Sequence, residues 1–185
     1  MGKRKYLTRI EKFIDDSPVV TFDSIQRLSS KGYAKLLINK LLKTKRLIRL
    51  AKGYYTNRND ISLAVYAFAP AYLGLQSALS AHDLWEQETI PIILTTQKVR
   101  NGIRQIDGAN ILLRTIDEKL YFGYKTLQEG DTYLPYSDIE KTYLDLLYYK
   151  QNINSETLKK IKKRLDSKKL KKYLKDYPKA FQKSL

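Results

Sequence analysis

The 185-residue chain has no cysteine and only one histidine, one tryptophan and one methionine. The lack of cysteine excludes disulfides, thiolate nucleophiles and cysteine-based zinc sites. No uncharged stretch approaches the roughly 18 apolar residues that a membrane-spanning helix needs. The charged residues 1–5 are not followed by the apolar segment of a secretory signal. We therefore expect a cytoplasmic protein that does not enter the membrane.

Acidic residues are also scarce, since 19 Asp and Glu face 35 Lys and Arg, which gives a formal net charge of +16. A surplus of this size favours a polyanionic partner, nucleic acid before an anionic membrane surface. A lysine-rich, heat-adapted surface would raise glutamate together with lysine, and this composition does not. The hydrophobic content of 43% is enough to build a core.

The positive charge is concentrated at the two ends of the chain. Residues 1–58 carry a net charge of +11, residues 59–150 a net charge of −4, and residues 151–185 a net charge of +9. A uniformly solvated surface would not produce this pattern. The distribution predicts two functional surfaces and two domains, residues 1–58 and residues 59–185, with a basic tail in the second domain from about residue 151.

The first domain shows a pattern of three helices followed by a hairpin. Thr8 opens a capping pattern for the first helix, and Pro18 ends that helix because it disfavours helical geometry in the preceding residue. Thr21 is a typical cap for a second helix over residues 22–28. A third helix is predicted over residues 31–44, because apolar residues recur there with helical spacing. They are Ala34, Leu37, Ile38, Leu41 and Leu42.

Cations and an amide occupy the opposite side of this third helix, where they can meet phosphates and base edges in the major groove of DNA. A strand at residues 47–50, a turn at Lys52-Gly53 and a returning strand at Tyr54-Tyr55 then form a basic hairpin. Three helices and a basic hairpin predict a winged helix-turn-helix. The predicted DNA-binding residues are Lys31, Tyr33, Lys35, Asn39, Lys43, Arg49 and Lys52.

The remainder predicts a small mixed α/β domain with a helical C-terminus, so that the whole chain is α+β. Asp60 is a cap for a helix to residue 67, and residues 72–84 lead into another short apolar helix. Ser137 and Glu140 form a capping-box pattern at the start of a longer helix. Strands are predicted at residues 90–96, 109–116, 120–125 and 132–134.

Two lysine-rich helices are predicted in the tail from Ser155 onward, and two interpretations of them stay open. They form either a solvated pair that packs by a narrow seam, or a second surface for phosphates or an acidic partner. A helix lying on a membrane surface is disfavoured, because the apolar face is narrow and lacks tryptophan. The candidates for a second basic surface are Lys159, Lys160, Lys163, Lys168 and Lys172.

Catalytic patterns are weak in this sequence. The pair His82-Asp83 lacks a nucleophile, and adjacent residues on a helix do not face each other. A nuclease interpretation has only Asp117-Glu-Lys119 and Asp166-Ser-Lys168, which fall in a predicted strand turn and a helix junction. No phosphate-binding glycine motif occurs. We expect no enzymatic activity, no cofactor and no metal site.

Taken in order, these segments resemble the AbiEi family of antitoxins and transcriptional regulators. The predicted winged helix ends in Lys52-Gly-Tyr-Tyr55, and residues 72–84 correspond to a "Ser-Ala-Leu…His-Gly-Leu" segment. The strand near residues 91–96 follows. Asp138-Ile-Glu-Lys-Thr-Tyr-Leu-Asp145 then resembles an "Asp-Pro-Glu-Arg-Thr-Leu-Leu-Asp" helix start. The resemblance covers roughly residues 5–150. Asp83 stands where glycine is usual, and the tail is shorter and more basic than the family pattern.

The resemblance implies the antitoxin of a type IV toxin–antitoxin system of abortive infection. Such a protein is a winged-helix repressor that binds inverted repeats in the double-stranded DNA of its own promoter. It counteracts a nucleotidyltransferase-like toxin through the region after the winged helix. The residues themselves leave two alternatives open, a stand-alone winged-helix transcription factor without a toxin and a winged-helix-targeted, metal-dependent nuclease.

Overall fold

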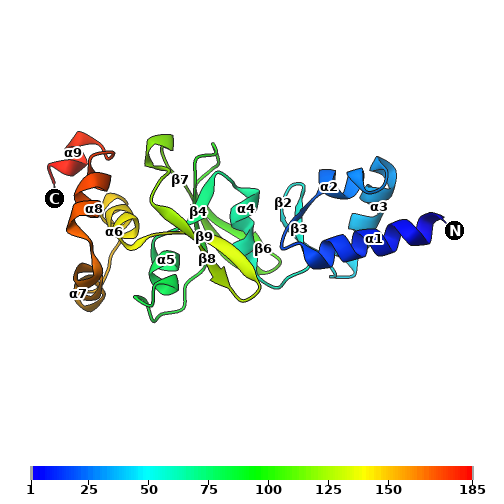
Figure 1. Ribbon diagram of the computed structural model, residues 1–185, viewed down its shortest axis with the longest axis horizontal. Helices are drawn as coiled ribbons and strands as arrows, with labels where there is room; N and C mark the ends of the chain where they lie inside the picture. Colours follow the sequence, from blue (N-terminus) through cyan, green and yellow to red (C-terminus); the bar gives the residue numbers. More distant parts are fainter. Residues whose placement is uncertain (1, 185) are drawn as a thin grey trace. The chain divides into compact units, whose positions relative to one another are not determined.

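The computed structural model describes the backbone of residues 2–184 and the side chains of residues 7–184. The fold is α+β and divides into two units (Figure 1). One contains residues 1–67 and 105–109, and the other contains residues 68–104 and 110–185. The sequence suggested a boundary after residue 58, whereas this division places residues 59–67 in the first unit. No helix in the described part is long and apolar enough to cross a membrane.

The first unit combines helices with a small antiparallel sheet. Strand β3 lies between β1 and β2 and pairs with both of them. The elements are α1 (Gly2–Asp16), β1 (Val20–Thr21), α2 (Phe22–Arg27), α3 (Lys31–Lys43), β2 (Ile48–Ala51), β3 (Tyr54–Thr56), the 3₁₀ helix η1 (Ile61–Leu63) and α4 (Ala64–Ala67).

The predicted cap of α2 is confirmed, and the predicted cap of α1 is wrong. Thr21 and Ser24 form a reciprocal capping box, with both side chain-to-backbone hydrogen bonds at 3.0 Å. The side chain of Ser30 caps α3. Helix α1 starts at Gly2, so Thr8 lies inside it. The residues before Thr8 include Lys and Arg, which are good helix formers, and propensity therefore extends the helix past a possible cap.

The core of the first unit is formed by one face each of α1, α2 and α3 against the sheet. As predicted, α3 contributes its apolar stripe to this core, but Leu42 lies at the edge and is only partly buried. The hairpin turns at Gly53, which has a φ of +84° and so adopts the left-handed conformation that glycine tolerates best. Buried in the cluster are Ile10, Ile14, Val20, Ile25, Ala34, Leu37, Ile38, Leu41, Leu47 and Tyr55.

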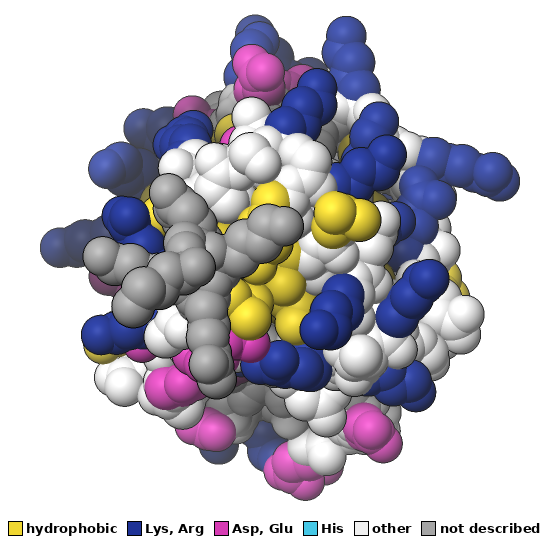
Figure 2. Space-filling view, turned by 90° about the vertical axis from the view of Figure 1, so that its right-hand side faces the viewer, with side chains coloured by type: hydrophobic (Ala, Val, Ile, Leu, Met, Phe, Trp, Pro, Cys, Tyr) yellow, Lys and Arg dark blue, Asp and Glu magenta, His cyan; other side chains and the backbone are white. Residues whose placement is uncertain are grey.

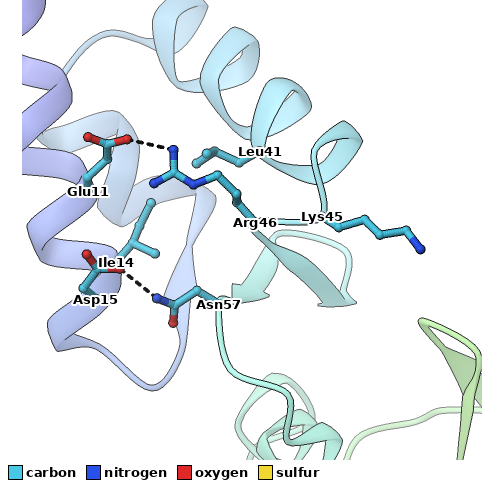
Figure 3. A pocket seen from close by; sticks show the side chains of 7 residues that line it. All are labelled: Glu11, Ile14, Asp15, Leu41, Lys45, Arg46 and Asn57. Atoms are coloured by element: carbon cyan, nitrogen blue, oxygen red, sulfur yellow. Dashed lines mark hydrogen bonds and ion pairs between the residues drawn. The ribbon is translucent and has the colours of Figure 1, made fainter.

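Two polar contacts connect α1 to the segments that follow α3 and β3 (Figure 3). Arg46 pairs with Glu11 at 3.0 Å, and the Asn57 side-chain amide donates to Asp15 at 2.9 Å. They border a hollow of about 220 Å³. Because the Arg46 side chain is 59% exposed, its ion pair contributes at most about 1 kcal/mol. Apolar packing therefore dominates the stability of this unit.

The second unit is built on a six-stranded mixed sheet with the strand order β6-β7-β5-β4-β9-β8, of which the division assigns only residues 105–109, at the β6–β7 turn, to the first unit. Strand β5 pairs parallel to β7 and antiparallel to β4, and β4 pairs parallel to β9. The elements are β4 (Ala71–Leu73), α5 (Gln76–Ala81), β5 (Ile92–Thr95), β6 (Gly102–Ile106), β7 (Ala109–Thr115), the 3₁₀ helix η2 (Glu118–Leu120), β8 (Tyr124–Glu129), β9 (Thr132–Ser137), α6 (Ile139–Tyr148), α7 (Ser155–Arg164), α8 (Ser167–Leu174) and α9 (Lys179–Gln182).

Several boundaries in this unit differ from the predictions. Residues 71–73 form a fully buried central strand, whereas the sequence pattern predicted only a lead into a helix. The prediction missed this strand because periodicity alone does not distinguish a short apolar run in a strand from one in a helix. Residues 102–106 form a strand that was not predicted. Asp117 caps a 3₁₀ helix, so β8 begins at Tyr124 rather than at residue 120. Asp138 is the residue that caps α6, whereas Ser137 ends β9.

A buried ion pair lies in the second unit, on α6. Lys141 and Asp145 lie one turn apart on α6, and their side chains are 0% and 1% exposed. The Lys141 ammonium donates to the Asp145 carboxylate and, at 2.8 Å, to the Tyr177 hydroxyl. Tyr177 and Tyr72 donate to Asp145 at 2.6 and 2.8 Å. The pair thus joins α6 to strand β4 and to the turn before α9.

Burial and the Asp145 carboxylate both act on Lys141 and on the two tyrosines. Burial lowers the pKa of Lys141, and the Asp145 carboxylate opposes that shift. Burial, followed by the charge of Asp145, raises the pKa of Tyr72 and of Tyr177. The ammonium also lies 5.0 to 5.6 Å from the ring centroids of Tyr72, Phe122 and Tyr177, where their faces attract a cation. Every group in this cluster has a partner.

Gly123 permits the close approach of chain segments beside this pair. Its φ is +68°, and a Cβ placed there would lie 2.8 Å from the Tyr173 ring and 2.9 Å from the Cβ of Lys141. A side chain at this position would therefore separate β8 from α6 and α8. Figure 1 shows α6 to α9 gathered at the C-terminal end of this unit.

We expect Asp145→Ala to destabilise the second unit by about 3–5 kcal/mol, because it leaves a buried ammonium without its anion. The double variant Lys141→Met with Asp145→Leu should be more stable than Asp145→Ala, since no unpaired charge remains, although two tyrosine hydroxyls lose their acceptor. Urea unfolding followed by fluorescence measures both, because the single tryptophan, Trp85, packs against the core of this unit. Equal stability of the single and double variants would contradict the proposed role of the unpaired charge.

Candidate nucleic-acid interface

The outward face of α3 carries the cluster that the sequence predicted. Lys31, Lys35, Asn39 and Lys43 are all exposed, and they lie opposite the stripe that enters the core. Within the described residues none of the four side chains has a hydrogen-bond or ion-pair partner. The side chains are therefore available to a ligand, and all of the charges among them are positive.

Three further residues belong to this face and were missed by the sequence reasoning. At about 100° of rotation per residue, Gly32, Leu36 and Lys40 also point away from the core, and all three are exposed. The same helical spacing that identified the lysines would have identified them. Leu36 and Gly32 carry no polar side-chain group, and so a pattern of cations and amides does not include them.

Tyr33 stands apart from the other predicted contacts on α3. It is half-buried and packs against the core of the first unit, while its backbone N–H donates to the Ser30 side chain. Much of the ring is thus used to complete the core. Only the exposed part of the side chain remains for a ligand.

The two predicted wing residues are exposed on the β2–β3 hairpin. Arg49 lies over the Tyr55 ring at 5.9 Å, and Lys52 lies at the turn. The backbone N–H of Phe22 donates to the carbonyl of Gly53 at 2.8 Å, which fixes the hairpin tip against the start of α2. A hollow of about 530 Å³ beside this contact includes Arg27 and Lys52 in its lining.

Figure 2 shows the side of the molecule that lies at the right of Figure 1. Lys and Arg side chains surround a small apolar patch there, and Asp and Glu side chains gather mainly toward the lower edge. A face with this separation of charge attracts a polyanion and orients it as it approaches. The charge pattern agrees with the exposed cations of α3.

Four of the five lysines predicted for a second basic surface are exposed. Lys159, Lys163, Lys168 and Lys172 are exposed on α7 and α8. The fifth, Lys160, pairs with Glu86 at 2.9 Å and with Glu156 at 3.1 Å, so its charge is already partly compensated within the chain. Hydrogen bonds to these two carboxylates raise its pKa.

Lys169 on α8 holds that helix to the start of α6. It pairs with Asp138 at 3.0 Å and with Glu140 at 2.9 Å. The Glu140 carboxylate also accepts from the backbone N–H of Asp166, and the Tyr173 hydroxyl donates to Asp138, both at 2.9 Å. The carboxylates of Asp138 and Glu140 therefore hold α8 against the start of α6.

His82 and Asp83 form the end of α5. The ring of His82 is buried, and its Nε2 donates to the carbonyl of Ser137 at 2.8 Å. Burial lowers the pKa of His82, so the ring is neutral near pH 7. Asp83 has a φ of +56°, and Leu84 donates to the carbonyl of Leu79 at 2.8 Å, as in a Schellman motif. The left-handed conformation explains why glycine suits the position of Asp83.

The two Asp-x-Lys patterns lie at helix starts. Asp117 accepts from the backbone N–H of Lys119, and Asp166 accepts from those of Lys168 and Lys169. Each carboxylate thus caps a helix. Within residues 7–184, no group of three or more His, Asp or Glu side chains is placed to hold a metal ion.

Glu140→Gln should lower the stability of the second unit by about 1.5 kcal/mol at neutral pH, since two hydrogen bonds lose their charge assistance. Burial would raise the pKa of Glu140, but the hydrogen bonds from Asp166 and Lys169 together lower it below its ordinary 4.5. The carboxylate therefore stabilises the fold above about pH 4.5, and that contribution is lost as the pH falls through the lowered pKa. Urea unfolding between pH 3 and 7 should show the gap between wild type and variant closing below pH 4.5; a constant gap would contradict this assignment.

No protein-family model matches the chain, and no curated protein sequence does. Among solved structures, the chain is similar to the crystal structure of the RV2827C protein from Mycobacterium tuberculosis, with a TM-score of 0.62. The two sequences are 16% identical, and the match covers 96% of this chain and 73% of that chain. At this identity the similarity shows a shared fold alone.

Proposed function

We propose that the first unit is a winged helix-turn-helix that binds double-stranded DNA. In this proposal α2 and α3 are the helix-turn-helix, α3 enters the major groove, and the β2–β3 hairpin is the wing. The observation that carries the proposal is the exposed face of α3, where several cations and one amide have no protein partner within the described residues.

The side chains on this face have two different tasks. Lys31, Lys35 and Lys43 lie along one side of the helix and contact phosphates, which provides affinity and fixes the position of the protein on the duplex. Asn39 stands near the middle of the face, where its amide is suited to bidentate pairing with adenine. Lys52 reaches the neighbouring backbone from the wing.

We infer further that the protein represses its own promoter as the antitoxin of a toxin–antitoxin pair. Support comes from the resemblance of the segments around residues 72–84 and 138–145 to the AbiEi family. In this proposal the second unit counteracts a nucleotidyltransferase-like toxin and the first unit binds the operator. The exposed lysines of α7 and α8 add a second contact surface for DNA or for an acidic partner.

Lys35→Ala should weaken binding to all duplexes and reduce the slope of affinity against salt by about 1, as expected for one lost phosphate contact. Asn39→Ala should instead relax base preference at one position. Mobility shifts of the upstream DNA across a salt series measure both effects. Lys119→Ala is the matched control, because Lys119 is an exposed lysine outside both basic surfaces. An unchanged slope for Lys35→Ala, or an unchanged preference for Asn39→Ala, would remove that residue from the interface.

For the antitoxin role, we expect a neighbouring gene to encode a nucleotidyltransferase-like protein that arrests growth when it is expressed alone. Coexpression of the full chain should restore growth. A chain that carries both Lys35→Ala and Asn39→Ala should still restore growth while it fails to repress the promoter, because the two tasks belong to different units. The absence of such a neighbour, or of rescue, would leave a stand-alone transcription factor as the function.

A further inference from the structure

Leu36 is the most exposed large apolar side chain in residues 7–184, at 71% of its maximum. It lies midway along α3, one residue after Lys35 and three before Asn39. The core of the first unit gains nothing from an apolar side chain at this position. A leucine surrounded by water and cations therefore suggests a function outside the fold.

Gly32 precedes Leu36 by one helical turn on the same face. Glycine destabilises a helix relative to alanine, and the backbone of Gly32 requires no special conformation. A Cβ at Gly32 would meet nothing within 4 Å in the chain. The fold therefore does not require this glycine. Because Gly32 has no side chain, the outward face of α3 beside Leu36 carries little bulk.

We propose that Leu36 reads the methyl group of a thymine in the major groove, and that Gly32 lets the helix approach the base edges closely enough for this contact. The inference rests on the proposed DNA-binding function and adds a specificity-determining residue to it. The cations around Leu36 favour DNA over a second protein copy as the partner, because two such faces would repel each other.

The chemistry of the major groove supports this assignment. Thymine is the base that presents a C5 methyl group there, and apolar side chains contact it favourably. Leu36 and Asn39 lie three residues apart, about 4.5 Å of rise along the helix, and both face away from the core, so they can reach the same few base pairs. The amide of Asn39 suits adenine. Together the two residues would read neighbouring A·T pairs.

Replacing single thymines of the bound duplex with deoxyuridine tests the proposal, because uracil differs from thymine only by the missing methyl. Wild-type protein should bind about three- to fivefold more weakly at one or two positions per half-site, as expected for one methyl-sized apolar contact. Leu36→Ala should bind the thymine duplex more weakly and be insensitive to uracil at those positions. Asn39→Ala should keep the uracil sensitivity.

Two further variants separate this contact from general effects. Ile103→Ala removes a comparably exposed apolar side chain, 64% exposed, from strand β6 and should leave both affinity and uracil sensitivity unchanged. Gly32→Ala should raise the melting temperature by a few degrees and yet weaken DNA binding. If Gly32→Ala binds DNA with full affinity, the proposed close approach of α3 to the base edges is overturned.

The outcomes distinguish this inference from the proposed function. If no duplex binds wild-type protein, the DNA-binding function itself fails. If DNA binds but uracil weakens wild type and Leu36→Ala equally, the thymine contact is overturned while the function stands. If Leu36→Ala instead converts a dimer of the free protein into a monomer in sedimentation experiments, Leu36 belongs to a protein interface and the proposal is also overturned.

Discussion

The ion pair of Lys141 and Asp145 is the contact on which the second unit depends. Both charges are removed from water, which is favourable only when each has several partners, and here the partners come from β4, α6 and the turn before α9. Loss of either charge would leave the other buried and unpaired. The C-terminal helices are therefore held in place by the ion pair, whose partners must all keep their positions, and by apolar packing around Tyr177.

The lysines named above fall into three groups. The burial of each side chain and the presence of a carboxylate partner decide to which group it belongs. Lys141 is a buried structural cation, Lys160 and Lys169 are paired with carboxylates, and the lysines on α3 have no partner within the described residues. Only the last kind offers a ligand its full charge. The net charge of +16 thus predicts a polyanionic partner, but it does not identify the surface that binds it.

The segment around residues 138–145, which carries part of the resemblance to antitoxins, is a structural motif in this fold. Asp138 caps α6 and accepts from Tyr173, and Glu140 holds the backbone of Asp166. Lys141 and Asp145 form the buried pair. The charged side chains of this motif contact other parts of the chain. The motif is therefore better evidence for a shared fold than for a shared ligand. The exposed lysines and the amide of α3, in contrast, have no such contacts within the described residues and are available to a ligand.

Local and periodic features were predictable from the sequence. The capped start of α2, the apolar stripe of α3 and the turn at Gly53 each depend on residues close together in the chain. The tertiary structure decided the rest. Residues 71–73 form a strand because β5 and β9 flank them, and Lys160 is paired because Glu86 lies beside it. Burial and pairing between distant residues leave no periodic signal. Helical spacing places Leu36 on the outward face of α3, but only the tertiary structure leaves it 71% exposed, more than any other large apolar residue in residues 7–184.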